Sequence, residues 1–444
     1  MERLILRDVA AAPLSHTLPM LQSLASPLTG IIPFTQQLLP VTDDARLFHV
    51  ASVTCDTEAL IGSAANRYNG GINFTYAGAL AAAIGEGLER YAGAYLDESR
   101  IRIASAEELG AAAASAASFA LFHPRQYAQP AFGYEPFTPQ TRIRWTPAYR
   151  LPGGEPAFVP TQLIHLGRAS HDEAHLGYAT SSGMACAASF EEAILSGLFE
   201  LVERDAFMLT WNNTLSLPLV DYSAQAAIVD DERRYYRSTG LRYHAVDLSV
   251  FHAIPTALGV VRDDSGEIAF AVGCASAATM RDAVRKALRE AFQTRTFARQ
   301  LRCDDPDWDK PADRIESFED HVLYHSLAHN APAAAFVDRS PARVRVADVA
   351  ALGGDGVTAR ILAIVDRLTR AGVDTFAVDT TPPDLRAAGL RTAAVVAPQL
   401  CRLDVPVRFR YLGGERLYRA AHELGLLARE QTIDDLNPFP HPFP

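Results

Sequence analysis

The strongest constraint on this 444-residue chain is a short charged motif that occurs twice within apolar, helix-forming stretches. Residues 86–90 and 200–204 both read E-x-x-E-R, and the two copies lie 114 residues apart. Positions i, i+3 and i+4 share one face of a helix, so each helix presents two carboxylates and one guanidinium side by side. A carboxylate on a buried helix is costly unless it meets a cation. The repeat therefore predicts two helices that offer a metal or phosphate site.

A second interpretation of the same residues is structural. Glu–Arg pairs within a helix contribute only ~0.2–0.5 kcal/mol and need no ligand. Glu192, two turns before Glu200, points to the same side of its helix, but Ser189 and Glu192 also match a helix capping box. On spacing alone, both interpretations remain open.

Hydrophobic periodicity predicts interleaved helices and strands. Helices are expected over 76–96, 105–121 and 190–211, and from an N-cap at Ser276 to residue 300. Strands are expected over 142–150, 157–166, 243–248, 257–261, 268–273, 375–379 and 392–397, with a hairpin turn at 263–266. This order predicts an α/β (α+β) fold of mixed sheets packed with helices. We expect an N-terminal extension (1–60) in the same fold, a catalytic domain (61–436) and a proline-rich tail (437–444).

Composition excludes several classes of protein. The formal net charge of −11 argues against a broad nucleic-acid surface, which needs clustered Lys and Arg. Residues 110–122, the most apolar run, are shorter than the ~20 residues that span a bilayer, and charged residues interrupt the first 20 positions. Five widely spaced cysteines form no C-x-x-C pair, which indicates reduced thiols. We expect a soluble, cytoplasmic protein without nucleic-acid or membrane partners.

Several blocks, taken in order along the chain, resemble the YcaO family. The central block 182–207 contains the second E-x-x-E-R, and 82–91 is similar to the family's first such block. Residues 287–295 look like the family's third ATP-contacting helix, 378–385 and 412–418 resemble its C-terminal half, and 24–30 resemble its azoline-forming branch. The resemblance implies a YcaO-type fold whose ATP site lies between two glutamate-bearing helices.

The resemblance also implies site residues. Magnesium would be bound by Glu86, Glu89, Glu200 and Glu203. ATP would be contacted by Glu86, Arg90, Glu192, Arg204, Gln293 and Arg295, with Glu290 as a further candidate. The chain departs from the family pattern at Ile72, Ala82, Ala185 and Ala188, where Lys, Ser, Ser and Asn are frequent.

The activity implied is an ATP-dependent cyclodehydratase acting on a ribosomal precursor peptide. A Cys, Ser or Thr side chain adds to the preceding amide carbonyl, and the amide oxygen leaves as phosphate, which gives a thiazoline or oxazoline. The expected partners are the precursor peptide, an E1-like protein that binds its leader, and an FMN-dependent azoline dehydrogenase. Two alternatives are peptide thioamide formation and a non-catalytic docking scaffold.

The last residues place the chain within the family. Prolines 438, 440, 442 and 444 alternate with Phe439, His441 and Phe443, which favours an extended polyproline conformation. Azoline-forming YcaO proteins often end in such a motif near the active site, so the resemblance assigns Pro444, Pro442 and His441 to catalysis. Because the tail lacks apolar periodicity, we expect it to bury little surface and to contribute little stability.

Overall fold

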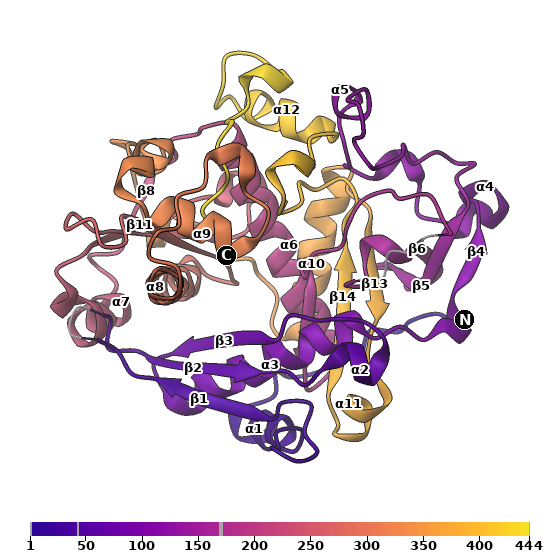
Figure 1. Cartoon of the computed structure of the whole chain (residues 1–444), viewed down its shortest axis with the longest axis horizontal. Coiled ribbons are helices and arrows are strands. Elements are labelled where there is room, and N and C mark those ends of the chain that lie inside the picture. Colours follow the sequence, from indigo (N-terminus) through magenta and orange to yellow (C-terminus); the bar gives the residue numbers. More distant parts are fainter. Residues whose placement is uncertain (1, 42–43, 168–171, 444) are drawn as a thin grey trace. The chain divides into compact units, whose positions relative to one another are not determined.

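A computed structural model describes residues 2–41, 44–167 and 172–443, and in it the chain forms two compact units. The first unit comprises Met1–Leu38, His49–Leu201 and Gly353–Leu400. The second comprises Leu39–Phe48, Val202–Leu352 and Cys401–Pro444. Figure 1 shows helices and several separate sheets, which confirms the predicted α+β class. Among the residues just specified, no helix is long and apolar enough to cross a bilayer.

The first unit contains two sheets. The three-stranded sheet has the order β1 (Phe34–Leu38), β2 (Phe48–Val53), β3 (Tyr68–Asn73). The larger sheet has the order β4 (Arg102–Ala104), β5 (Ile143–Leu151), β13 (Thr375–Asp379), β14 (Arg391–Val396), β7 (Met184–Ala187), and β6 (Glu155–Pro160) pairs with β5. Its helices include α1 (Leu14–Gln22), α2 (Thr57–Ile61), α3 (Tyr76–Ala94), α4 (Ala106–Leu109), α5 (Pro124–Tyr127), α10 (Val357–Arg370) and α11 (Pro383–Ala387).

Helix α3 packs on the three-stranded sheet (Figure 1). Its apolar side, which includes Ala83, Ile84 and Leu88, joins a buried cluster with residues of α1 and β2. A Cβ atom on Gly71 of β3 would lie 2.4 Å from backbone atoms of α3, so glycine permits this close approach. Burial of one side of α3 leaves its charged residues on the other side.

The second unit is built around a five-stranded sheet. Its order is β11 (Phe270–Ser276), β10 (Thr256–Arg262), β9 (Arg242–Asp247), β8 (Leu219–Asp221), β12 (Arg343–Arg345). Its helices include α7 (Ala226–Asp231), α8 (Met280–Asp304), α9 (Phe318–Ser326) and α12 (Glu415–Glu423), and α8 packs on β10 and β11. Helix α6 (Phe190–Asn212) begins in the first unit and ends in the second.

Most predicted elements are present, including the long helices α3 and α6 and the β10–β11 hairpin. The helix predicted over 105–121 is wrong, because α4 ends at Gly110 with a φ of +59° and only short 3-10 turns follow. The predicted N-cap Ser276 is also wrong. Ser276 ends β11, and Thr279 caps α8 by accepting the backbone N–H of Asp282. The division at residues 60 and 436 stays a prediction.

Candidate active site

The first E-x-x-E-R lies in the second half of α3, and its charged side chains are partly buried. Arg90 Nη2 donates to Glu86 Oε1 at 3.1 Å, and Arg90 also pairs with Glu89. The other oxygen of Glu86 accepts the backbone N–H of Gly70 at 2.8 Å. The side chain of Glu86 remains 34% exposed. Two carboxylates that share one face of α3 provide the oxygen ligands that Mg²⁺ prefers.

The turn before α6 positions Glu200. Gly183 has a φ of +85°, a conformation that favours glycine, and its N–H donates to Glu200 Oε2 at 3.1 Å. A Cβ atom on Gly197 of α6 would lie 2.4 Å from Gly183 O, so this contact needs two glycines. Burial, followed by the negative charge of Glu89, raises the pKa of the Cys186 thiol on β7 to about 12. Within the first unit, β7 therefore passes close to the α3 motif.

The Glu192 side chain is held by hydrogen bonds at the start of α6. Its Oε2 accepts from Ser189 Oγ at 2.9 Å, and Ser189 Oγ accepts the Glu192 N–H at 3.2 Å. Its Oε1 accepts the backbone N–H of Ala12 at 2.7 Å. These contacts fit the helix-start interpretation of the sequence. Nucleotide contact by Glu192 stays a prediction, and in this structure both of its oxygens already accept hydrogen bonds.

The second E-x-x-E-R continues along α6 into the second unit. Arg204 Nη1 donates to Glu203 Oε1 at 2.8 Å, and the Glu203 side chain is only 3% exposed. The ring of Phe443 lies against the guanidinium, with Arg204 Cζ 4.0 Å from the ring centroid. A buried carboxylate needs compensating cations, so the surroundings of Glu203 suit a site that receives positive charge.

Asp205, which follows the motif, anchors this part of α6. Its carboxylate accepts from Arg416 at 2.8 Å, from His252 Nε2 at 2.8 Å and from the Cys401 N–H at 2.8 Å. Burial alone would raise the pKa of Asp205, but the Arg416 guanidinium and His252 hold that pKa below its usual range. Asp205 is not among the predicted site residues, although its position directly after E-x-x-E-R was a signal.

Helix α8 carries the remaining nucleotide candidates. Gln293 is half-buried, and Glu290 lies 3.6 Å from Lys286 Nζ. Arg295 is 2% exposed and forms ion pairs with Asp44 (2.8 Å), Asp263 (3.0 Å) and Glu267 (3.2 Å). The contacts of Arg295 are those of a buried structural ion-pair network. A nucleotide contact by this residue stays a prediction.

The C-terminal tail is anchored inside the second unit, and the expectation that it buries little surface is wrong. Phe443 is 4% exposed and belongs to the main hydrophobic cluster, and His441 and Pro442 are buried. His441 Nε2 donates to the Asp404 carbonyl at 2.7 Å, and its Nδ1 accepts the Phe443 N–H at 3.2 Å. Both ring nitrogens thus hold backbone groups. Pro444 lies outside the described residues, and catalysis by Pro442, Pro444 and His441 stays a prediction.

Comparison with known proteins identifies the family. Residues 70–401, which are most of the chain, match the family model described as YcaO cyclodehydratase, ATP- and Mg²⁺-binding. The chain belongs to the YcaO family. The resemblance inferred from the two E-x-x-E-R blocks is thereby confirmed, as are ATP and Mg²⁺ as cofactors. Within the first unit, the two carboxylates of the α3 motif, Glu86 and Glu89, fit a magnesium ion chemically.

Solved structures share the fold of this YcaO protein. A heterocyclase in complex with substrate and cofactor superimposes with a TM-score of 0.80 at 23% identity, over 100% of this chain and 59% of that chain. The heterocyclase TruD superimposes with a TM-score of 0.72 at 23% identity, over 100% of this chain and 56% of TruD. YcaO from Methanopyrus kandleri, bound with AMPPCP and Mg²⁺, superimposes with a TM-score of 0.64 at 17% identity. This match covers 88% of this chain and 91% of that chain. The chain thus spans under two thirds of the two heterocyclases.

A sequence relative adds little on function. An uncharacterized protein in the tfuA 3′ region of Rhizobium leguminosarum bv. trifolii is 30% identical over 168 residues. The match covers 35% of this chain and 40% of that protein.

Proposed function

We propose that this YcaO protein is the ATP-dependent cyclodehydratase component that forms thiazolines or oxazolines from Cys, Ser or Thr of a ribosomal precursor peptide. The observation that carries this proposal is the seating of the proline-rich tail on the second E-x-x-E-R. Phe443 lies against Arg204, which is paired with the buried Glu203. Membership of the cyclodehydratase family supports the same reaction type.

In this proposal Glu86, Glu89, Glu200 and Glu203 hold magnesium, and Arg90, Arg204 and Gln293 contact the nucleotide. ATP supplies the phosphoryl group that turns the amide oxygen into a leaving group. The protein's share is positioning and charge neutralisation, the usual basis of phosphoryl-transfer catalysis. Nucleotide contact by Glu192 and Arg295 also stays a prediction, and in this structure both side chains contact protein groups.

Co-expression with short Cys-, Ser- and Thr-rich peptides encoded near the gene, followed by mass spectrometry, tests the reaction. The proposal expects loss of one water mass per ring, and loss of two further hydrogens where an FMN-dependent dehydrogenase is present. A gain in mass from replacement of oxygen by sulfur would establish thioamide formation instead. An unmodified peptide in the presence of all candidate partners would favour a non-catalytic scaffold.

The proposal includes an E1-like partner that binds the leader of the precursor peptide. A fold neighbour, the Escherichia coli microcin synthetase McbBCD, is a complex, with a TM-score of 0.58 at 14% identity over 91% of this chain and 96% of that chain. A partner that binds the leader would raise the local concentration of the modifiable residues at the catalytic chain.

A further inference from the structure

The backbone chemistry of the tail demands donors from other segments. Proline has no N–H, so a segment with proline at 438, 440 and 442 cannot pair as an ordinary strand. Its carbonyl groups are nevertheless polar, and a buried carbonyl group needs a hydrogen-bond donor. Side chains must therefore supply the hydrogen-bond donors that the N–H groups of a neighbouring strand supply in a β-sheet.

Four side chains of the second unit supply these donors. They approach the tail carbonyls in order along the chain: Arg410 Nη1 at Asn437 O (2.8 Å), Trp211 Nε1 at Phe439 O (3.1 Å), His325 Nε2 at Pro440 O (2.7 Å) and His321 Nδ1 at His441 O (2.8 Å). We call this set the donor ladder. Because each donor meets one carbonyl, the ladder specifies the register of the tail.

Two members of the donor ladder come from one helix. Ser317 caps α9 by accepting the Asp320 N–H, and His321 and His325 follow one turn apart. Four residues along a helix place two side chains on the same face, so the two imidazoles reach successive carbonyls. Burial lowers the pKa of His325 to about 3, so the ring is neutral at neutral pH and its single N–H is committed to Pro440.

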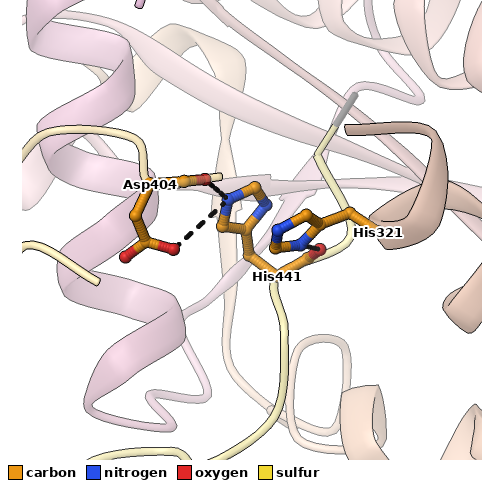
Figure 2. A group of neighbouring side chains, drawn as sticks. All are labelled: His321, Asp404 and His441. Carbon is orange, nitrogen blue, oxygen red and sulfur yellow. Dashed lines mark hydrogen bonds and ion pairs between the residues drawn. The ribbon is translucent and has the colours of Figure 1, made fainter. Parts of the chain in front are cut away.

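The cluster of His321, Asp404 and His441 is a tail clasp and not a metal site (Figure 2). The two imidazole rings stack with centroids 4.0 Å apart and planes 17° from parallel. A metal ion lies close to the plane of each imidazole that binds it, at ~2.0–2.1 Å from nitrogen, and no point satisfies this for two stacked rings. His321 Nε2 also lies 2.7 Å from Val405 O. A neutral imidazole has one N–H, so the bond to the tail carbonyl requires the tautomer protonated at Nδ1.

The register of the tail determines where Phe443, the last described residue, lies. The His441 ring, held at the Asp404 carbonyl, accepts the N–H of Phe443. The Phe443 ring then lies against Arg204, and its centroid is 5.0 Å from the centroid of the Phe207 ring on α6. A slip of the tail would exchange phenylalanine for proline at this position and remove the aromatic face from the guanidinium.

We propose that His321 and His325 are positioning residues, which set the register of the tail so that Phe443 holds Arg204 in its nucleotide-binding orientation. The inference rests on the proposed nucleotide contact by Arg204. The histidines act through the tail and need not touch the substrate.

The test measures the affinity of the full chain for AMPPCP with Mg²⁺ by calorimetry. His325→Leu removes the donor, whereas His325→Gln keeps an N–H donor at a similar distance from the main chain. We expect about a tenfold loss of affinity for His325→Leu, the size of a lost partly desolvated cation–π contact. His325→Gln should restore affinity to within about twofold of wild type. For His321, which faces the tail with Nδ1, the corresponding pair is His321→Leu and His321→Asn.

A double-mutant cycle identifies the route of the effect. Phe443→Leu should weaken nucleotide binding as much as His325→Leu, and adding His325→Leu to Phe443→Leu should cause no further loss. His329→Leu is the matched control, because His329 is exposed and pairs with Asp309 away from the tail. Hydrogen exchange of the Phe443 N–H, which donates to His441 Nδ1 in the seated tail, reports tail seating independently of nucleotide. This exchange should accelerate in His325→Leu and stay at the wild-type rate in His325→Gln.

Three outcomes would overturn the proposal. Wild-type affinity in His325→Leu would do so, as would an additive loss in the double variant or unchanged hydrogen exchange of the Phe443 N–H in His325→Leu. In these cases wild-type binding and ring formation would be unaffected, so the proposed function would stand. If the wild-type chain bound no nucleotide with Mg²⁺, the proposed function itself would fail, and this inference with it.

Discussion

At the scale of single residues, Glu203 and Asp404 are buried carboxyl groups with opposite solutions to the cost of burial. Glu203 is paired with Arg204 at 2.8 Å. Asp404 is 2% exposed, and its nearest cationic group, Arg410 Nε, is 3.8 Å away. Burial raises the pKa of Asp404 to about 6, with Arg410 opposing the shift. Glu203 thus meets a cation on its own helix, whereas burial drives Asp404 towards its neutral form.

Glu203→Gln should remove a magnesium ligand while keeping the shape of the side chain. We expect at least a tenfold loss of affinity for AMPPCP with Mg²⁺, because under-compensated metal charge misplaces the phosphates. The melting temperature should change by no more than about 2–4 °C, which corresponds to ~1 kcal/mol for units of this size. Glu415→Gln, at an exposed position, is the control. Unchanged nucleotide affinity in Glu203→Gln would remove this residue from the metal site.

Asp404 predicts a pH dependence of stability. Its folded-state pKa, about 6, lies above the unfolded value, so the folded state binds the proton more tightly. Its contribution to stability is therefore fully present below about pH 4 and is lost as the pH rises through about 6. Asp404→Asn removes this titration. The melting temperature of Asp404→Asn relative to wild type should rise between about pH 4 and pH 7, by the equivalent of ~2 kcal/mol. A constant difference would contradict the raised pKa.

At the scale of elements, sequence patterns predicted the long helices but not the contacts between segments that are distant in the chain. Apolar spacing was enough for α3, because burial of one helix face produces a 3.6-residue periodicity in the sequence. For α6 the signal was a long, mostly apolar run without proline, and its second half is buried nearly all round. The helix over 105–121 was wrong, because alanine propensity was outweighed by the positive φ of Gly110. Tail burial was missed, because no sequence pattern links 437–443 to Trp211 or His325.

Deletion of residues 439–444 should destabilise the second unit. Loss of buried Phe443 alone is comparable to a Phe→Ala core substitution, which costs about 3–5 kcal/mol. Calorimetry should show a lowered unfolding transition together with loss of nucleotide affinity. Phe443→Leu separates the two effects, because it retains most of the apolar volume and loses the ring over Arg204. An unchanged transition after the deletion would contradict the buried tail.

At the scale of the whole molecule, the chain passes repeatedly between its two units, and each unit is assembled from three separate segments. No local pattern predicts that assembly, because it depends on pairings between distant segments, such as β5 with β13. Family resemblance supplied the fold and the cofactors. The protein contacts of Glu192 and Arg295 needed coordinates, because a structural contact and a nucleotide contact use the same residue types.

The proposed assembly with a leader-binding partner makes a kinetic prediction. Ring formation by the chain alone should be slow, and the E1-like partner should accelerate it by about 10²-fold or more through effective concentration. The acceleration should disappear with a precursor peptide from which the leader has been removed. Full activity and tight leader binding by the isolated chain would contradict this division of labour.

The central claim is that ATP activates a peptide amide oxygen, and the fate of that oxygen tests it most directly. A precursor peptide carrying ¹⁸O in the amide carbonyl before a modified Cys is incubated with the protein, its partner, ATP and Mg²⁺. The side chain displaces the phosphorylated oxygen, so the label should appear in inorganic phosphate, one atom for each ring formed. Label retained in the peptide or released as water would contradict the account.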